Sequence, residues 1–540
     1  AIEQARQRVL AGAGGRESEH IVQVISLYNG ARYSAYTFRR YDDVRLVMAP
    51  ELQLGYFGGD ADNFTYPRYS LDMSFLRVYE NDQPFQTEHF FPWSTGGAAE
   101  GETVFVVGNP GSTNRLETVA QLEYRRDISE RYLFDWLNSR VEALEQYVEE
   151  DPSDAVRNQL FSLLNAQKLY RGRLRGLEDP VLMARRRDTE AQFRAAIEAS
   201  PELREEYGSL IDEMAELQQE RRLLEDEFAA FFGLTPTSSL GSTVMRRAML
   251  AARLVNLREA GAPEEQQAAL VGQILSIGDQ PEMLQEMYLV DRLEALEEHI
   301  ADQSAALANL LAADDTESLA ADIVQSSALT DSAETARAID EGELEEDAAV
   351  QLALTFSDIF ADYTSASAGI AAQEQELAAR LGRARFEVYG TSIPPDATFS
   401  LRIADGVVSG YPYNGTIAPS HTTYYGMYDR FFAFGPGTEW DLPPVWAQVP
   451  ESLELSTPLN LVSTNDIIGG NSGSPLLNED LELVGLVFDG NIESLPSSFI
   501  YVTERARAVS VDSRGMLEAL RAVYRADRIA DELTTGVAVN

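Results

Sequence analysis

A serine in a glycine-rich turn is the strongest candidate for a nucleophile in this sequence. Ser472 lies in the turn GGNSG (469–473), within the segment 464–488, and strand-like runs flank the turn. A nucleophilic serine needs a hydroxyl that projects from the backbone and successive N–H groups that point at the developing oxyanion. Glycines permit the required backbone dihedrals and the close approach of a substrate. The pattern predicts either such a nucleophile or a hairpin turn without chemistry.

A second polar cluster lies in the loop FGGDADNFTYPRYSLDMSFLRVY (57–79). Its glycines, acids and Asn63 lead to Asp72, which stands just before an apolar strand-like run. A carboxylate there could orient a histidine, as the third member of a catalytic triad does. The alternative is a structural cap or a salt bridge. The oxygen spacing partly resembles a calcium loop, but no glutamate closes a 12-residue loop, and we expect no metal site.

Composition excludes several classes of function. The formal net charge is 43 − 87 = −44, which disfavours nucleic acid and anionic lipid as partners. No apolar stretch approaches the ~18–20 residues of a membrane span. The chain has no cysteine and only four histidines, which excludes disulfides, thiol nucleophiles and Cys-ligated metals. We expect no cofactor.

The elements that must position these residues change character twice along the chain. Residues 19–110 alternate like β-strands, with a hairpin signal at Asn29–Gly30. From about residue 116 to 385 the composition and the apolar spacing are typical of helices. From residue 386 strand-like runs return, and an amphipathic helix follows them. This pattern predicts three parts: residues 1–115 as β core, 116–385 as an inserted α-helical domain, and 386–540 as a second β part with the serine turn.

Together the two polar segments resemble the dipeptidyl-peptidase 7 / dipeptidyl aminopeptidase BII family of bacterial serine exopeptidases. The matching segments are GGDADNFTYPRYSLD (58–72), GNPGSTNR (108–115), PPDATFSLRIADGVVSGYPYNGT (394–416) and TNDIIGGNSGSP with GLVFDGN (464–491). Phe64, Tyr66, Tyr69, Ser70 and Leu71 depart from the family pattern, although the ring positions stay aromatic. The resemblance implies a multi-domain α+β fold: a trypsin-like double β-barrel, incomplete on its N-terminal side, with a large helical insertion.

The resemblance also assigns roles to residues. It implies that Ser472 is the nucleophile, that Asp72 orients the base, and that the N–H groups of Gly470 and Ser472 form the oxyanion hole. Asn63 and Asp489 would hold the free N-terminal ammonium of a peptide. The family has a third amine ligand, an asparagine on its helical domain, and Asn165 is the residue of this chain that we match to it.

One member of the catalytic machinery has no match. The general-base histidine of the family lies in a TNHHC-like segment upstream, and nothing in this chain resembles that segment. His20 is the only histidine in a suitable order, whereas His89, His299 and His421 are interpreted as structural or surface residues. We expect an N-terminally truncated piece of an active enzyme, the signal peptide lying in the missing segment. The alternative is a natural homologue that binds peptides without cleaving them.

The expected function is therefore that of a serine dipeptidyl aminopeptidase acting on peptides with a free N-terminus. In the family, Arg after the amine-binding Asp implies a preference for acidic residues before the cut, and Gly a preference for bulky apolar ones. Gly490 stands at that position and predicts the apolar preference. The resemblance further implies a homodimer located in the periplasm or secreted.

Overall fold

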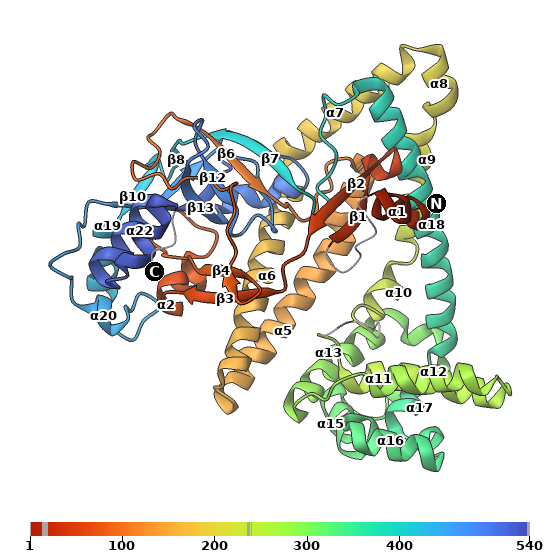
Figure 1. Cartoon of the computed structure of the whole chain (residues 1–540). Coiled ribbons are helices and arrows are strands. Elements are labelled where there is room, and N and C mark those ends of the chain that lie inside the picture. The colour runs from red at the N-terminus through yellow and green to blue at the C-terminus, as the bar shows by residue number, and fades with distance from the viewer. Residues whose placement is uncertain (1, 13–19, 235–237, 239, 537–540) are drawn as a thin grey trace. The chain divides into compact units, whose positions relative to one another are not determined.

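The computed structural model describes residues 2–12, 20–234, 238 and 240–536. The chain forms two compact units. Residues 1–117, 172–208 and 378–540 make up the sheet unit, and residues 118–171 and 209–377 make up the helical unit. The expected mixture of helices and sheets is confirmed (Figure 1). No helix in the described ranges is long and apolar enough to span a membrane.

A seven-stranded antiparallel sheet forms the centre of the sheet unit. Its strands, in spatial order, are β10 (His421–Thr423), β11 (Pro458–Ser463), β14 (Ala508–Asp512), β13 (Leu483–Gly490), β12 (Pro475–Leu477), β6 (Thr103–Gly108) and β7 (Arg402–Val407). Segments far apart in the sequence therefore become neighbours. The sheet buries Val104, Leu461, Leu476, Val484 and Val487 against one another, as expected for apolar and β-branched strands with a covered face.

Smaller strand pairings complete the β structure. They are β1 (His20–Leu27) with β2 (Arg32–Arg39), the three-stranded sheet of β3 (Asp43–Met48), β4 (Phe75–Glu80) and β5 (Gln83–Pro84), and β8 (Tyr411–Tyr413) with β9 (Thr416–Ala418). The hairpin predicted around Asn29–Gly30 is confirmed, since β1 and β2 pair from His20↔Arg39 to Leu27↔Arg32.

Further helices belong to this unit. They are α1 (Ile2–Gly12), α2 (Leu52–Gly55), α3 (Gly59–Asp62), α7 (Pro180–Glu198), α8 (Pro201–Tyr207), α19 (Tyr424–Phe434), α20 (Pro444–Ala447), α21 (Ser513–Glu518) and α22 (Asp527–Thr535). Asp512 caps α21 by accepting a hydrogen bond from the N–H of Arg514, as acidic side chains commonly do at helix N-termini.

The helical unit has its own apolar core, built around Leu254, Leu289, Leu293 and Val350. Its helices are α4 (Val119–Tyr124), α5 (Glu130–Glu150), α9 (Leu210–Arg222), α10 (Glu225–Ala230), α11 (Thr243–Glu259), α12 (Glu264–Leu275), α13 (Glu282–Ile300), α14 (Ala305–Leu311), α15 (Thr316–Ser326), α16 (Ser332–Glu341) and α17 (Ala348–Leu354). Capping side chains start several of them. Thr118 and Gln121, for example, form a reciprocal capping box at α4.

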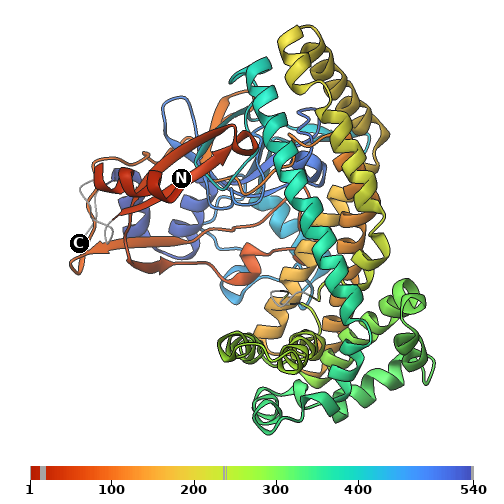
Figure 2. The same cartoon turned by 90° about the vertical axis from the view of Figure 1, so that its right-hand side faces the viewer.

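Two long helices contribute residues to both units. They are α6 (Asp154–Glu178) and α18 (Ser357–Tyr389), and Figure 2 shows α18 as one continuous teal helix. The elements between Val119 and Tyr389 are helical, as the texture of the sequence indicates. Residues 172–208 nevertheless group with the sheet unit. The division at residues 115 and 385 into three domains stays a prediction.

Candidate functional site

The serine turn is fastened to the central strand β13. The N–H of Gly473 donates to the carbonyl of Val487 at 2.7 Å, and the N–H of Val487 donates to the carbonyl of Ser474 at 2.9 Å. Ser472 directly precedes these anchored residues and is exposed to solvent. The turn therefore presents the hydroxyl-bearing residue at the surface, while the two residues that follow it are fixed to the sheet.

The backbone N–H groups of the turn divide into two sets. Those of Asn471, Gly473 and Ser474 donate to carbonyl groups of the chain. Among the residues that the structure describes, the N–H groups of Gly469, Gly470 and Ser472 make no such bond. Those of Gly470 and Ser472 are the two groups that the family resemblance assigns to an oxyanion hole.

Gly470 is a position where only glycine fits. Its φ is 107°, a region that L side chains rarely adopt, and an added Cβ would lie 2.5 Å from the carbonyl oxygen of Asn109. The N–H of Gly111 also donates to the carbonyl of Gly469 at 2.7 Å. The segment GNPG (108–111) therefore packs directly against the serine turn, which explains why both segments are rich in glycine.

The polar loop of residues 57–72 is held to the same sheet at several points. Thr422 of β10 donates its hydroxyl to the carbonyl of Arg68 at 2.7 Å. The fully buried amide of Asn460 on β11 accepts from the N–H of Ser70 at 2.9 Å and donates to its carbonyl at 2.8 Å. Leu71 then donates its N–H to the carbonyl of Leu54. These bonds fix the backbone directly before Asp72.

A buried ion pair connects this loop to β13. Nη1 of Arg68 lies 2.8 Å from Oδ2 of Asp489, and the same oxygen accepts the N–H of Phe64 at 3.0 Å. Oδ1 of Asp489 accepts the N–H of Gly490 at 2.8 Å. The side chains of Arg68 and Asp489 are only 3% and 8% exposed. Asp489 lies two residues after Val487 in β13. The same strand therefore binds the serine turn through Val487 and bears this carboxylate.

Burial and charge oppose each other at the two carboxylates. Desolvation raises the pKa of Asp489 above its usual range, and the Arg68 guanidinium counteracts that rise. Desolvation by neighbouring atoms also raises the pKa of Asp72 above its usual value. The charge of Arg68 opposes this rise, and the charge of Asp489 adds to it. Asp72 is nevertheless exposed to solvent. Within the described ranges it forms no ion pair or hydrogen bond, so that it is neither the cap nor the salt bridge of the alternative interpretation.

The remaining predicted binding residues lie in different settings. Asn63 is buried at the C-terminus of α3, directly before Phe64, whose N–H binds Asp489. Gly490 is buried at the end of β13. Asn165 is exposed on α6, in the part of that helix that belongs to the helical unit. Its part in an amine site stays a prediction.

The histidines have other neighbours. His421 lies 3.0 Å from the carbonyl of Ala98 through Nε2, and burial lowers its pKa. His299 lies 3.1 Å from a carboxylate oxygen of Asp226 in the helical unit. His89 is exposed, and His20 begins β1. Over the described part of the chain, no histidine is hydrogen-bonded to Ser472 or Asp72.

Arg68 contacts the candidate site residue Asp489, and the sequence alone assigned it no role. An arginine that is 2% exposed needs a partner of opposite charge, because burying an unpaired cation is costly. The sequence shows Arg68 only as one charge among several in the loop. Its partner is 421 residues away along the chain, so that no local signal could have identified the pair.

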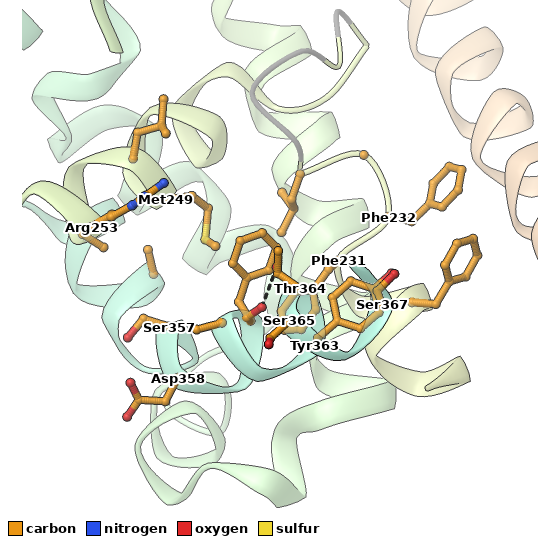
Figure 3. Close-up of a pocket in the computed structure, with 18 of the residues that line it drawn as sticks. Phe231, Phe232, Met249, Arg253, Ser357, Asp358, Tyr363, Thr364, Ser365 and Ser367 are labelled. Carbon is orange, nitrogen blue, oxygen red and sulfur yellow. Dashed lines mark hydrogen bonds between the residues drawn. The ribbon is translucent and has the colours of Figure 1, made fainter. Parts of the chain in front are cut away.

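A large cavity occurs elsewhere, in the helical unit. It has a volume of about 1220 Å³. Figure 3 shows Arg253 and Asp358 at the end opposite to Phe232. None of its described lining residues is a histidine, and its serines do not lie in a glycine-rich turn. We therefore place the candidate active site at Ser472. The described residues also contain no cluster of acids and histidines that could hold a metal ion.

The architecture matches that of solved peptidase structures. The crystal structure of Porphyromonas endodontalis DPP11 aligns with a TM-score of 0.77 at 19% identity, covering 99% of this chain and 80% of that chain. A structure described as its alternate conformation gives a TM-score of 0.59 at 21% identity, covering 97% and 79%. At these identities the likeness concerns the fold.

The sequence comparison defines the family. The Peptidase S46 family model matches residues 1–535, and the chain belongs to this family. The chain is 26% identical to the Asp/Glu-specific dipeptidyl-peptidase of Shewanella putrefaciens, over 94% of this chain and 77% of that protein. It is 23% identical to the dipeptidyl-peptidase 7 of Capnocytophaga gingivalis, over 96% and 76%. The resemblance drawn from the motifs is confirmed.

Replacing Arg68 with Met should destabilise the fold in a pH-dependent way. Breaking a buried ion pair from one side costs about 3–5 kcal/mol. Without Arg68 the pKa of Asp489 rises further, so that the loss is largest at neutral pH, where the unpaired carboxylate is still charged. It should shrink as the pH falls through the raised pKa and Asp489 takes up a proton. Urea unfolding of both proteins between pH 5 and 8 measures this difference.

Two further variants provide the controls. Arg68→Met combined with Asp489→Asn should recover part of the lost stability, because it removes the charge that Arg68 neutralised. Arg39→Met breaks the exposed pair with Glu80 and should cost at most about 1 kcal/mol. A loss at Arg68→Met that is equal at all pH values would contradict the assignment.

Proposed function

We propose that this chain is a serine dipeptidyl aminopeptidase that releases dipeptides from the free N-termini of peptides. The observation that carries the proposal is the sharing of β13: the strand anchors the Ser472 turn at Val487 and bears Asp489 two residues later. A nucleophile and an amine-binding carboxylate at a fixed short separation are what an exopeptidase needs to measure a dipeptide. Relatives named as dipeptidyl-peptidases support this proposal.

Ser472 is the proposed nucleophile. Its hydroxyl would attack the carbonyl carbon of the second residue, and the resulting oxyanion would accept the N–H groups of Gly470 and Ser472. The absence of a bond from these two groups to the described part of the chain supports this role. Asp72 would orient the imidazole that takes the serine proton. No described histidine is assigned as that base.

The proposed ammonium seat consists of Asn63 and Asp489, with Asn165 as a third candidate. An ionised carboxylate has about four lone-pair sites, and Asp489 uses three of them for Phe64 N–H, Gly490 N–H and Arg68. One site is left for a ligand. Arg68 would keep the carboxylate ionised despite its burial.

For the residue before the cut we propose a preference for bulky apolar side chains. Gly490 adds no side chain and no charge beside Asp489. Arg68 is buried and already paired with Asp489, so that it offers no free cation to an acidic substrate. Burying a carboxylate without a partner costs several kcal/mol. Relatives named Asp/Glu-specific and relatives named dipeptidyl-peptidase 7 both match at similar identity, so that Gly490 itself supports this preference.

Several coarser features follow from the family resemblance as proposals. The seven-stranded sheet and the three-stranded sheet would be parts of a trypsin-like double barrel, with residues 116–385 as the inserted helical domain. A homodimer and a periplasmic or secreted location belong to the same proposal. The competing function is that of a peptide-binding homologue that keeps the amine seat and does not cleave.

In a protein that also carries the histidine segment of the family upstream of residue 1, Ser472→Ala should abolish hydrolysis of dipeptidyl arylamides and covalent labelling by a fluorophosphonate, because both need the serine oxygen. Ser162→Ala, at an exposed position on α6, should change neither. Release of the arylamine and mass spectrometry of the labelled peptide measure the two effects. Equal rates and labelling in Ser472→Ala and the unchanged protein would remove Ser472 from the mechanism. Dipeptide binding without any hydrolysis would favour the peptide-binding homologue.

Asp489→Asn should weaken binding of a dipeptide with a free amine by about 30- to 3,000-fold, since it removes one partner of a buried charge-assisted pair. The N-acetylated dipeptide, which has no ammonium group, should bind weakly to both proteins. Isothermal calorimetry measures both ligands. Asp480→Asn, at an exposed turn between β12 and β13, is the matched control. An acetylated dipeptide that binds as tightly as the free one would eliminate the ammonium seat.

The unchanged protein should bind Leu-Phe at least about 10-fold more tightly than Leu-Asp, because several kcal/mol oppose burial of the second carboxylate. The same calorimetric titration measures this ratio, with Leu-Asn as the uncharged control close in size to Leu-Asp. Tighter binding of Leu-Asp than of Leu-Phe would refute the apolar preference.

A further inference from the structure

The side-chain position at residue 490 is blocked by one neighbouring atom. Gly490 is buried, and its φ lies outside the positive range. A Cβ added there would meet Oγ of Ser494 at 2.4 Å, whereas the next neighbours, Cβ of Ser494 and the carbonyl oxygen of Arg507, lie at 3.5 Å. The latter two are ordinary van der Waals distances. Of the three atoms nearest to this Cβ, the Ser494 hydroxyl oxygen is therefore the one that collides with it.

This hydroxyl is held in place. Ser494 is 9% exposed and lies in the 3₁₀-helix η6 (Ile492–Ser498), which follows β13 directly. Its Oγ–H donates to the carbonyl of Asn491 at 2.7 Å, and its N–H donates to the same carbonyl at 2.9 Å. A short buried side chain with a satisfied hydrogen bond does not leave its rotamer without cost.

Asn491 in turn is fixed to the sheet. It is fully buried, and its side chain donates to the carbonyl of Arg505 and accepts the N–H of Arg507, both at 2.8 Å. Its own N–H donates to the carbonyl of Arg507 at 3.0 Å. The start of η6, and Ser494 with it, is therefore fixed to the backbone of residues 505–507, directly before β14, and not determined by the exposed surface.

We infer that Ser494 is a further specificity-determining residue. Its hydroxyl restricts position 490 to glycine and so prevents a second cationic side chain, besides Arg68, from being introduced next to Asp489 at that position. This inference rests on the proposed function, in which residue 490 borders the pocket for the residue before the cut. A change from an apolar to an acidic preference then requires two substitutions: one that introduces a cation at 490 and one that removes the hydroxyl at 494.

The steric part is tested by a double-mutant cycle on thermal stability. Gly490→Ala should lower the melting temperature by about 2–6 °C, as expected for overpacking of a buried site. In a Ser494→Ala background the same substitution should lower it by less than about 1 °C, because the blocking atom is gone. Equal shifts in both backgrounds would overturn the inference and leave the proposed function untouched.

Gly485 provides a matched control on the same strand. A Cβ at that glycine would meet the carbonyl oxygen of Val511 at 2.8 Å, which is a backbone atom that Ser494→Ala does not remove. Gly485→Ala should therefore lower the melting temperature equally with and without Ser494→Ala. A general softening of the sheet by Ser494→Ala would instead change both glycine positions alike, and the inference would be wrong.

The specificity part is tested by binding of the dipeptides Leu-Phe and Leu-Asp. Gly490→Arg alone should lose binding of both, because the arginine cannot be accommodated. Gly490→Arg with Ser494→Ala should bind, and its preference for Leu-Asp over Leu-Phe should rise at least about 10-fold relative to the unchanged protein. Gly490→Arg that acquires the acidic preference without a change at 494 would overturn the inference alone. A confirmed stability cycle with no change in preference in the double variant would reject both the inference and the proposed role of residue 490.

Discussion

The buried pair of Arg68 and Asp489 is the interaction on which the candidate site depends. It joins a loop near the N-terminal part of the chain to the central strand β13, at a contact distance of 2.8 Å and with both side chains almost fully buried. Charges can be kept inside a protein only when they are paired and their remaining hydrogen-bonding capacity is used. Phe64 and Gly490 supply two N–H groups to the same carboxylate, and the carbonyl of Asp62 accepts from Arg68. The loop cannot shift away from the strand without exposing this arrangement.

The serine turn is fixed by a different kind of force, close packing of backbone on backbone. Gly470 and the segment 108–111 approach so closely that a single added methyl group would collide with a carbonyl oxygen. Hydrogen bonds to Val487 then orient the turn on β13. The strand β13 thus forms an ion pair with the loop at Asp489 and hydrogen bonds with the serine turn at Val487. A reaction that must occur at a set distance from the end of a peptide benefits from such a shared rigid support.

Local constraints also limit how the site can vary. The space at position 490 is shaped by the hydroxyl of Ser494, which donates to the carbonyl of the buried Asn491, and Asn491 is bonded in turn to the backbone of Arg507 directly before β14. A change of charge at position 490 is therefore coupled to a change of volume at position 494 in η6. The general acidity of the chain, with a formal charge of −44, acts over longer distances and is screened beyond about 8 Å at physiological salt. The short-range contacts should dominate recognition.

The sequence by itself determined the features that depend on contiguous residues. The turn 469–473, the loop that ends at Asp72 and the motif after β13 identified the family, because each needs particular residues at adjacent positions. The helical texture between residues 116 and 385 and the hairpin at Asn29–Gly30 follow from local periodicity and turn chemistry. The tertiary structure alone decided the rest: the pairing of Arg68 with Asp489, the grouping of residues 172–208 with the sheet unit, and the contact that restricts residue 490 to glycine. Desolvation and steric exclusion depend on which atoms approach one another in space. When two such residues are hundreds of positions apart, the sequence around each of them does not indicate that they approach.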